Sequence, residues 1–203
     1  MFEYENISGR NVERVEALSD GIFAVAMTIL VLELKIPEHL SSEHLLVGTL
    51  IDSLPKIITW VLSMITLGVF WIAQQTQLDH TESIDKSLTW LHFLFLTSIT
   101  LIPFSSGVFS NYPEFRTSLI VYWVNILFSG ICLLFTWAYT SKRGLVKSDS
   151  PENIVRIIFT RELISQSFYV GGVIIGIFNI SLGMGFIIFV QLNCAVLPPK
   201  KEK

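Results

Sequence analysis

Charged side chains stand at both ends of the first apolar segment of the chain. Arg14, Glu16 and Asp20 precede its apolar part, and Glu33 and Lys35 follow it. The charge-free stretch between Asp20 and Glu33 is twelve residues long, whereas a helix needs about 20 residues to span a bilayer. An ionisable side chain inside a membrane-spanning segment usually faces protein or a water-filled cavity. We therefore predict that this segment lies in the interior of the protein, away from lipid.

One face of the same segment is apolar when it is drawn as a helix of about 100° per residue. The stripe consists of Leu18, Gly21, Val25, Thr28, Ile29, Leu32 and Ile36. Asp20 lies roughly 140° from its centre, so we expect the carboxylate to point into packing and to need a partner there. Arg14 or Ser19, of the same or a neighbouring subunit, is available. A stripe of this kind is ordinarily a packing face, and periodicity alone does not distinguish a packing face from the lining of a pathway.

The sequence lacks the common motifs of enzymes and of metal sites. It contains no His-Glu-x-x-His pair, nucleophile elbow, phosphate-binding loop or paired cysteine motif, and no intramembrane acid–base or metal constellation. We predict that the protein is not an enzyme and has no cofactor or resident metal. The net charge of −3, without a basic patch interleaved with aromatic residues, excludes nucleic acid as an expected partner.

The elements that position these residues are long apolar runs. Of the 203 residues, 51% are hydrophobic and 15% are charged, whereas about a quarter of a soluble domain is charged. We predict an all-α integral membrane protein with a single domain over residues 1–203 and six transmembrane helices. Pro37 is expected to end the first helix and Pro103 to bend the third. The predicted helices span residues 11–36, 54–77, 86–109, 116–139, 156–178 and 181–197.

The basic residues predict the orientation of these helices. With both termini in the cytoplasm, the outer side holds only Lys35, Lys56 and Arg116, and the other eleven basic residues lie on the inner side. A five-helix arrangement would place the basic C-terminal tail outside. The bias therefore supports an even number of spans, two of which would divide the uncharged run of residues 163–199.

The run of residues 14–37 resembles the helix 1 signature of the transmembrane protein 175 family, which comprises the lysosomal potassium channel of animals and shorter prokaryotic relatives. The signature is an arginine, a Phe-Ser-Asp triplet, a threonine eight residues after the aspartate, and then a proline. Leu18 replaces the phenylalanine. The matching residues are Arg14, Ser19, Asp20, Thr28 and Pro37.

The resemblance implies a moderately selective potassium channel whose pore is lined by helix 1, with potassium as its permeant ion. The hydrophobic constrictions of the family correspond to Val25, Ile29 and Leu32, and a threonine layer linked to selectivity corresponds to Thr28. Arg14, Ser19 and Asp20 would form the motif that supports helix 1. Because prokaryotic members with one six-helix unit are similar to tetramers, we expect a homotetramer in the bilayer of the cell membrane.

Three further positions depart from the family pattern. Gln74 and Gln75 stand shortly after Phe70-Trp71, where the family often has histidine, and His92 follows Trp90-Leu91, where asparagine is frequent. The roles of these three side chains are left open by the resemblance.

The sequence contains no pore loop resembling Thr-Val-Gly-Tyr-Gly, so ion passage would be controlled by apolar rings that exclude water. Two other functions compete with the channel. One is a proton-coupled secondary transporter in which Asp20, Arg14 and His92 form a relay. The other is a non-conducting membrane scaffold whose first helix is an oligomer interface.

Overall fold

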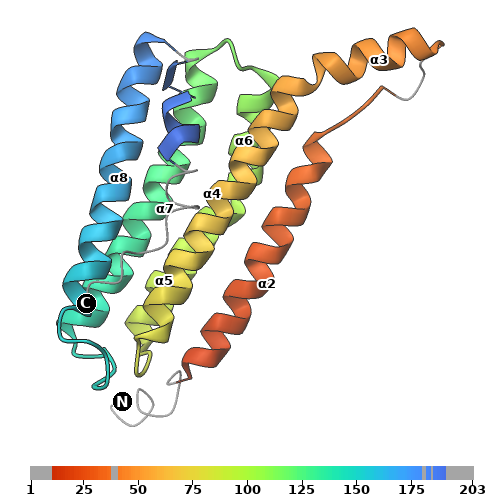
Figure 1. The fold of residues 1–203 in the computed structure, drawn as a ribbon. Coiled ribbons are helices and arrows are strands. Elements are labelled where there is room, and N and C mark those ends of the chain that lie inside the picture. The colour runs from red at the N-terminus through yellow and green to blue at the C-terminus, as the bar shows by residue number, and fades with distance from the viewer. Residues whose placement is uncertain (1–10, 38–40, 180–181, 184, 191–203) are drawn as a thin grey trace.

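The protein is an all-helical bundle, seen in a computed structural model that describes residues 11–37, 41–179, 182–183 and 185–190. The helices lie roughly along one direction, except for one that leaves the bundle at one end (Figure 1). Residues 182–183 and 185–190 are also helical. The named elements are α2 (Val12–Leu30), the 3-10 helix η1 (Val31–Glu33), α3 (Glu43–Asp52), α4 (Leu54–Asp79), α5 (Lys86–Thr100), α6 (Ile102–Asn111), α7 (Arg116–Lys142) and α8 (Ile154–Phe178).

Several of these helices are long and apolar enough to cross a membrane, which makes this a multi-pass membrane protein. Within the described residues, four spans meet both requirements: Val12–Glu33, Leu54–Asp79, Lys86–Asn111 and Arg116–Lys142. The predicted last helix, residues 181–197, falls for the most part outside the described residues.

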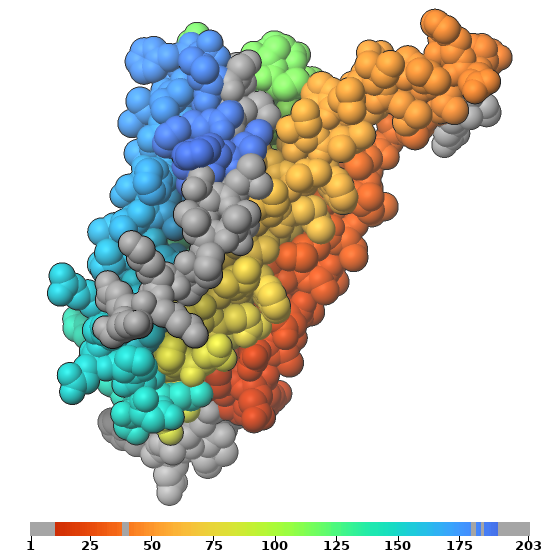
Figure 2. Space-filling view, in the orientation of Figure 1, coloured from red at the N-terminus to blue at the C-terminus, as the bar shows by residue number. Residues whose placement is uncertain are grey.

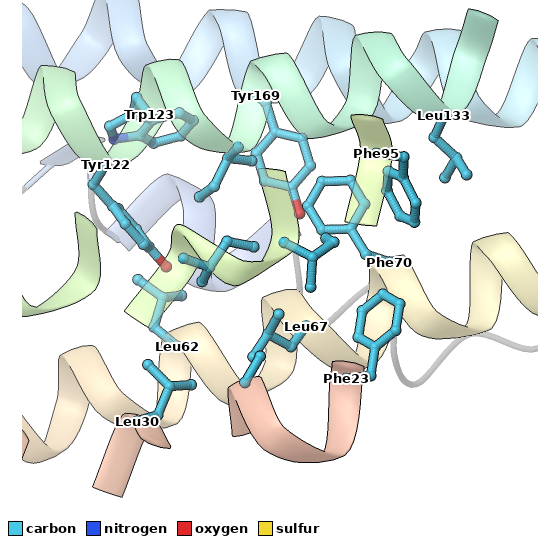
Figure 3. Close-up of a cluster of buried hydrophobic side chains, with 14 of the residues drawn as sticks. Phe23, Leu30, Leu62, Leu67, Phe70, Phe95, Tyr122, Trp123, Leu133 and Tyr169 are labelled. Atoms are coloured by element: carbon cyan, nitrogen blue, oxygen red, sulfur yellow. The ribbon is translucent and has the colours of Figure 1, made fainter. Parts of the chain in front are cut away.

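Aromatic side chains join α2 to the rest of the bundle. The ring of Phe95 in α5 lies 6.2 Å from the rings of both Phe23 in α2 and Phe70 in α4, measured between centroids. All three side chains are buried, and they meet in the cluster shown in Figure 3. On the far side of the bundle, Trp123 of α7 contacts Tyr169 of α8 with a centroid distance of 5.9 Å. Phe23, which makes this aromatic contact, lies on the buried face of α2. This is the face through which α2 packs against the bundle.

The first helix ends earlier than its predicted boundary at residue 36. After Leu30 the chain tightens into η1, and Leu34 leaves the helical region with φ −85° and ψ 81°. Helical geometry is disfavoured at Ile36 because it precedes Pro37. The helix therefore includes the stripe as far as Leu32, and Ile36 lies beyond its end.

A short helix, α3, lies between the first two expected helices, where the sequence predicts none. Its N-terminus is capped by Ser42, whose hydroxyl oxygen accepts a hydrogen bond from the backbone N–H of Leu45 at 3.3 Å. Glu43 lies in the first turn, where a negative charge favours the helix dipole. The cap and the charge together favour the start of the helix. Gly48 in the middle of α3 lowers its intrinsic helix propensity, so the sequence alone gives only a weak helix signal here.

The predicted bend at Pro103 is a full interruption of the third span. Two helices, α5 and α6, meet at Leu101, and Pro103 lies in the first turn of α6. A proline has no N–H to donate to the carbonyl four residues earlier, which here belongs to Ile99. The N–H of Leu101 instead donates to the carbonyl of Ser98 at 3.3 Å, which closes α5.

Hydrogen bonds between loops stabilise the end of the bundle at which α4 ends and α5 begins. The turn between α4 and α5 pairs with the segment after α7, through hydrogen bonds from Glu82 N–H to Leu145 O (2.8 Å) and from Lys147 N–H to His80 O (2.9 Å). Leu78, Ile84 and Leu88 are buried in a second, smaller apolar cluster with Val12 and Val15 of α2 packed against it. The start of α2 is therefore held at the same end as these loops.

Candidate functional site

The two faces of α2 have opposite environments. Ser19, Phe23, Ala26 and Leu30 are buried against the bundle. The predicted stripe lies on the other side, where the exposed fractions are 57% for Val25, 42% for Ile29 and 65% for Leu32. Figure 2 shows α2 along the edge of the molecule, with no other described helix in front of it. One copy of the chain therefore leaves this apolar stripe uncovered.

Thr28 lies among the exposed residues of this face. Its hydroxyl donates to the carbonyl of Val25 at 2.8 Å, which fixes the direction of the hydrogen. The lone pairs of the oxygen are then directed away from the helix backbone and can accept from water or contact a cation. Thr28 thus places a hydroxyl oxygen among the apolar side chains of Val25, Ile29 and Leu32.

A hollow of about 680 Å³ runs beside the stripe. On the α2 side it is lined by Leu18, Val25 and Ile29, and on the other by Thr100, Pro103 and Phe104 at the junction of α5 and α6. Its walls are largely apolar, as expected of a surface that receives another hydrophobic element.

Asp20 is held by α4. Its Oδ1 accepts hydrogen bonds from Trp71 Nε1 at 2.8 Å and from Gln75 Nε2 at 2.9 Å. The expected partners within the same copy, Arg14 and Ser19, do not take this place, and Arg14 is exposed. The reason is that positions 71 and 75 are four residues apart, so α4 presents two donors on one face directly opposite the carboxylate.

Ser19 also contacts α4, through the side-chain amide of Gln74, the residue before Gln75. Its hydroxyl donates to the Val15 carbonyl at 2.7 Å and accepts from Gln74 Nε2 at 2.6 Å. Gln74 and Gln75, whose roles the sequence left open, are therefore the two amide donors that fix the Ser19-Asp20 pair. The sequence offered one sign of this role, which is that two consecutive amides within a long apolar helix need polar partners.

His92 belongs to the buried part of α5 rather than to this contact. Its side chain is 3% exposed, and its Nδ1 has no hydrogen-bond partner among the described residues. In the part of the chain that the structure describes, no group of three or more histidine, cysteine, aspartate or glutamate residues could hold a metal ion.

Glu33 closes the far end of the stripe. Its carboxylate lies against Gly107 of α6, where an added Cβ would come within 2.7 Å of its Cδ and Oε2. Glu33 also lines the hollow next to Val25 and Ile29. The apolar stripe thus ends at a carboxylate, which the small residue on α6 makes room for.

Comparison with known proteins shows what the chain is similar to. Residues 14–103, which include most of α2, the Ser19-Asp20 contacts and the start of α6, match the sequence profile described as endosomal/lysosomal potassium channel TMEM175. A protein named a potassium channel from Chryseobacterium sp. (strain P1-3) is 27% identical over 94% of this chain and 95% of its own length. The chain is thus similar to the TMEM175 family over residues 14–103. A second relative, a protein named a potassium channel from Chamaesiphon minutus, is 32% identical over 54% of this chain and 56% of its own length.

The fold of the chain also has a solved counterpart. The crystal structure of a lysosomal potassium-selective channel TMEM175 homologue from Chamaesiphon minutus superposes with a TM-score of 0.81. The sequences are 24% identical, and the match covers 91% of this chain and 96% of the other. The two proteins share their fold over nearly their whole lengths.

Proposed function

We propose that the protein is a subunit of a moderately selective potassium channel in which α2 of several copies lines the pore. The observation that carries this proposal is the uncovered stripe of α2. Lipid is an unsuitable cover because charged residues stand at both ends of a charge-free stretch too short for a bilayer. Other copies of the same helix are a suitable cover, and relatives of this chain bear the name potassium channel.

The assembly we propose is a homotetramer around α2 in the cell membrane. Each subunit would have six transmembrane helices, counting α5 with α6 as one, α8 as the fifth and residues 181–197 as the sixth. The basic residues support an orientation with both termini in the cytoplasm. The start of α2 and the α4–α5 turn would then lie on the inner side, and α3 on the outer side.

In this channel the apolar rings act as the gate. Four copies of Val25, Ile29 and Leu32 would surround the axis, and a narrow apolar ring excludes water and therefore ions. Thr28 lies within this series, where its hydroxyl oxygens would contact a partly dehydrated ion. Potassium gives up its water at a lower cost than sodium, so such a barrier favours potassium moderately.

Arg14, Ser19 and Asp20 would support the pore helix instead of lining the pore. The hydrogen bonds of Asp20 and Ser19 to α4 fix the rotation of α2 about its own axis. That rotation decides which side chains of α2 face the pore. No enzymatic step and no cofactor enter this function, and potassium is present only in transit.

The alternative is a proton-coupled secondary transporter that uses Asp20, Arg14 and His92 as a relay. Asp20 takes its hydrogen bonds from Trp71 and Gln75, while His92 is buried in α5. These contacts give the three residues separate surroundings and favour the channel.

The test is an ion-flux measurement on purified protein in liposomes. We expect flux down a potassium gradient that exceeds sodium flux, does not saturate at physiological concentrations and needs no proton gradient. Saturable flux that requires a pH gradient would favour the transporter. Absence of flux from protein shown to be correctly assembled would refute both the channel and the transporter. The non-conducting scaffold would then be the remaining function.

A further inference from the structure

The helix α3 is poorly covered by the described part of the fold. None of its ten residues is buried, although four of them are large aliphatic side chains that occupy an arc of about 140° on one face. These residues are Leu46, Val47, Leu50 and Ile51. Glu43 shares the arc only in the first turn. We call these four residues the α3 apolar face.

The opposite side of α3 is mostly polar. His44, Thr49 and Asp52 lie there together with Gly48, and Leu45 is its one large apolar residue. A helix with one apolar and one polar side is built to lie between a hydrophobic surface and water. The α3 apolar face therefore needs a cover that the described part of one copy does not provide.

The direction of α3 indicates what that cover is. It leaves the end of α4 and extends past α2, to the side of α2 that faces away from the bundle (Figures 1 and 2). The stripe of Val25, Ile29 and Leu32 is exposed on the face of α2 opposite its contacts with the bundle. In an assembly around α2, the space beyond α2 is occupied by the next copy of the chain, not by lipid.

We propose that α3 reaches over the outer end of the neighbouring subunit and packs its apolar face there, clasping adjacent subunits of the channel outside the pore gate. This proposal rests on the assembly around α2 proposed above. The outer part of each subunit has apolar side chains available to receive α3. Leu54 and Ile58 of α4, and Leu101 and Phe104 at the junction of α5 and α6, are all exposed in one copy.

The clasp adds a second contact to the assembly, distinct from the stripe. The α2 contact has to permit opening, because it also forms the gate. A contact through α3 lies away from the axis and can hold subunits together while the gate changes its width. Its polar side, with Thr49 and Asp52, would face the outer solution.

The test is photocrosslinking of the full-length channel in its native membrane. Benzoylphenylalanine replaces Leu50 on the apolar face or, as the matched control, the adjacent Thr49 on the polar side. A third variant carries the photoreactive residue at Leu18, at the inner end of the α2 stripe, where the family often has an aromatic residue. After illumination, the products are separated by mass under denaturing conditions.

We expect Leu50 to give covalent dimers and higher multiples of the subunit mass, and Thr49 to give at least about tenfold less, since a benzophenone reacts only with groups in contact. Multiples from Leu18 together with lipid adducts alone from Leu50 would overturn the clasp while leaving the assembly around α2 intact. Equal yields of multiples from Leu50 and Thr49 would also contradict packing through the apolar face. Absence of multiples from all three positions would refute the assembly around α2 and the clasp with it.

Discussion

The indole N–H of Trp71 donates a hydrogen bond of 2.8 Å to the carboxylate of Asp20. This bond joins α2 to α4 near the end of the bundle at which α2 begins, and Gln75 adds a second donor to the same oxygen. One turn further along, Phe23 and Phe70 meet on Phe95. A polar contact and an aromatic contact thus fix α2 at two levels, and both lie on the face opposite the stripe.

Replacing Trp71 with phenylalanine should loosen the attachment of α2 while keeping an aromatic ring in place. The change removes one hydrogen bond to a charged group, so we expect a loss of about 1 kcal/mol in stability and a higher basal potassium flux. Thermal unfolding in detergent and liposome flux measure the two effects. Trp90→Phe is the matched control, because Trp90 is largely exposed on α5. Equal effects of the two substitutions would contradict a special role for Trp71.

Removing the hydroxyl of Ser19 should cost more than removing that of a surface serine. Ser19→Ala leaves the buried amide of Gln74 without its acceptor, and an unsatisfied buried donor costs about 1–3 kcal/mol. Ser167→Ala is the control, since Ser167 is exposed and bonds only to its own helix. A double-mutant cycle with Gln74→Leu isolates the pair. Additive effects of Ser19→Ala and Gln74→Leu would show that the two side chains do not act together.

Thr28→Ala should lower the permeability ratio of potassium to sodium, because it removes the one hydroxyl among the proposed apolar rings. Thr28→Ser retains the hydroxyl and should preserve the ratio. Thr97→Ala on α5 removes another exposed hydroxyl, one that bonds to its own helix, and serves as the control. Reversal potentials under bi-ionic conditions give the ratio. An unchanged reversal potential in Thr28→Ala would exclude Thr28 from selectivity.

A cysteine at Val25 should react with a thiol reagent small enough to enter the pore, and the reaction should block current. Ala26→Cys is the matched control because Ala26, the next residue along the chain, is buried against the bundle. Both substitutions are made in a background without Cys132 and Cys194. Current recorded before and after reagent gives the answer. Persistent current after reagent in Val25→Cys, with the protein present in the membrane, would argue that Val25 faces elsewhere.

Gly130→Ala should destabilise the contact between α7 and α8. An added Cβ at this position would overlap the side-chain amide of Gln166, which fills the space beside the glycine. Overpacking of this kind costs about 1–3 kcal/mol. Gly68→Ala, in the middle of α4 with nothing within 4 Å of its added Cβ, should instead be neutral or stabilising. Thermal unfolding compares the two variants, and a similar melting temperature for both would show that Gln166 moves aside freely.

The exposed stripe could be read from the sequence because it depends on local periodicity. Every third or fourth residue from Leu18 to Leu32 is small or apolar, and a helix places such residues on one side whatever surrounds it. The all-helical fold follows from long apolar runs in the same way.

The partners of Asp20 could not be read from the sequence, since they depend on how α2 and α4 are turned toward each other. Trp71 and Gln75 lie more than fifty residues from Asp20 in the chain, and nothing local to Asp20 distinguishes them from Arg14. The helix α3 was missed for a different reason. Its start depends on the cap by Ser42, while Gly48 lowers the helix propensity of the segment.

The dependence of α2 on α4 has a consequence for the biogenesis of the protein. A charged residue inside a span raises the free energy of membrane insertion, most strongly at the centre of the bilayer, and Asp20 stands at one end of the short uncharged core of α2. The donors that satisfy Asp20 are synthesised later, when α4 leaves the ribosome. We therefore expect stable insertion of α2 to follow the synthesis of α4.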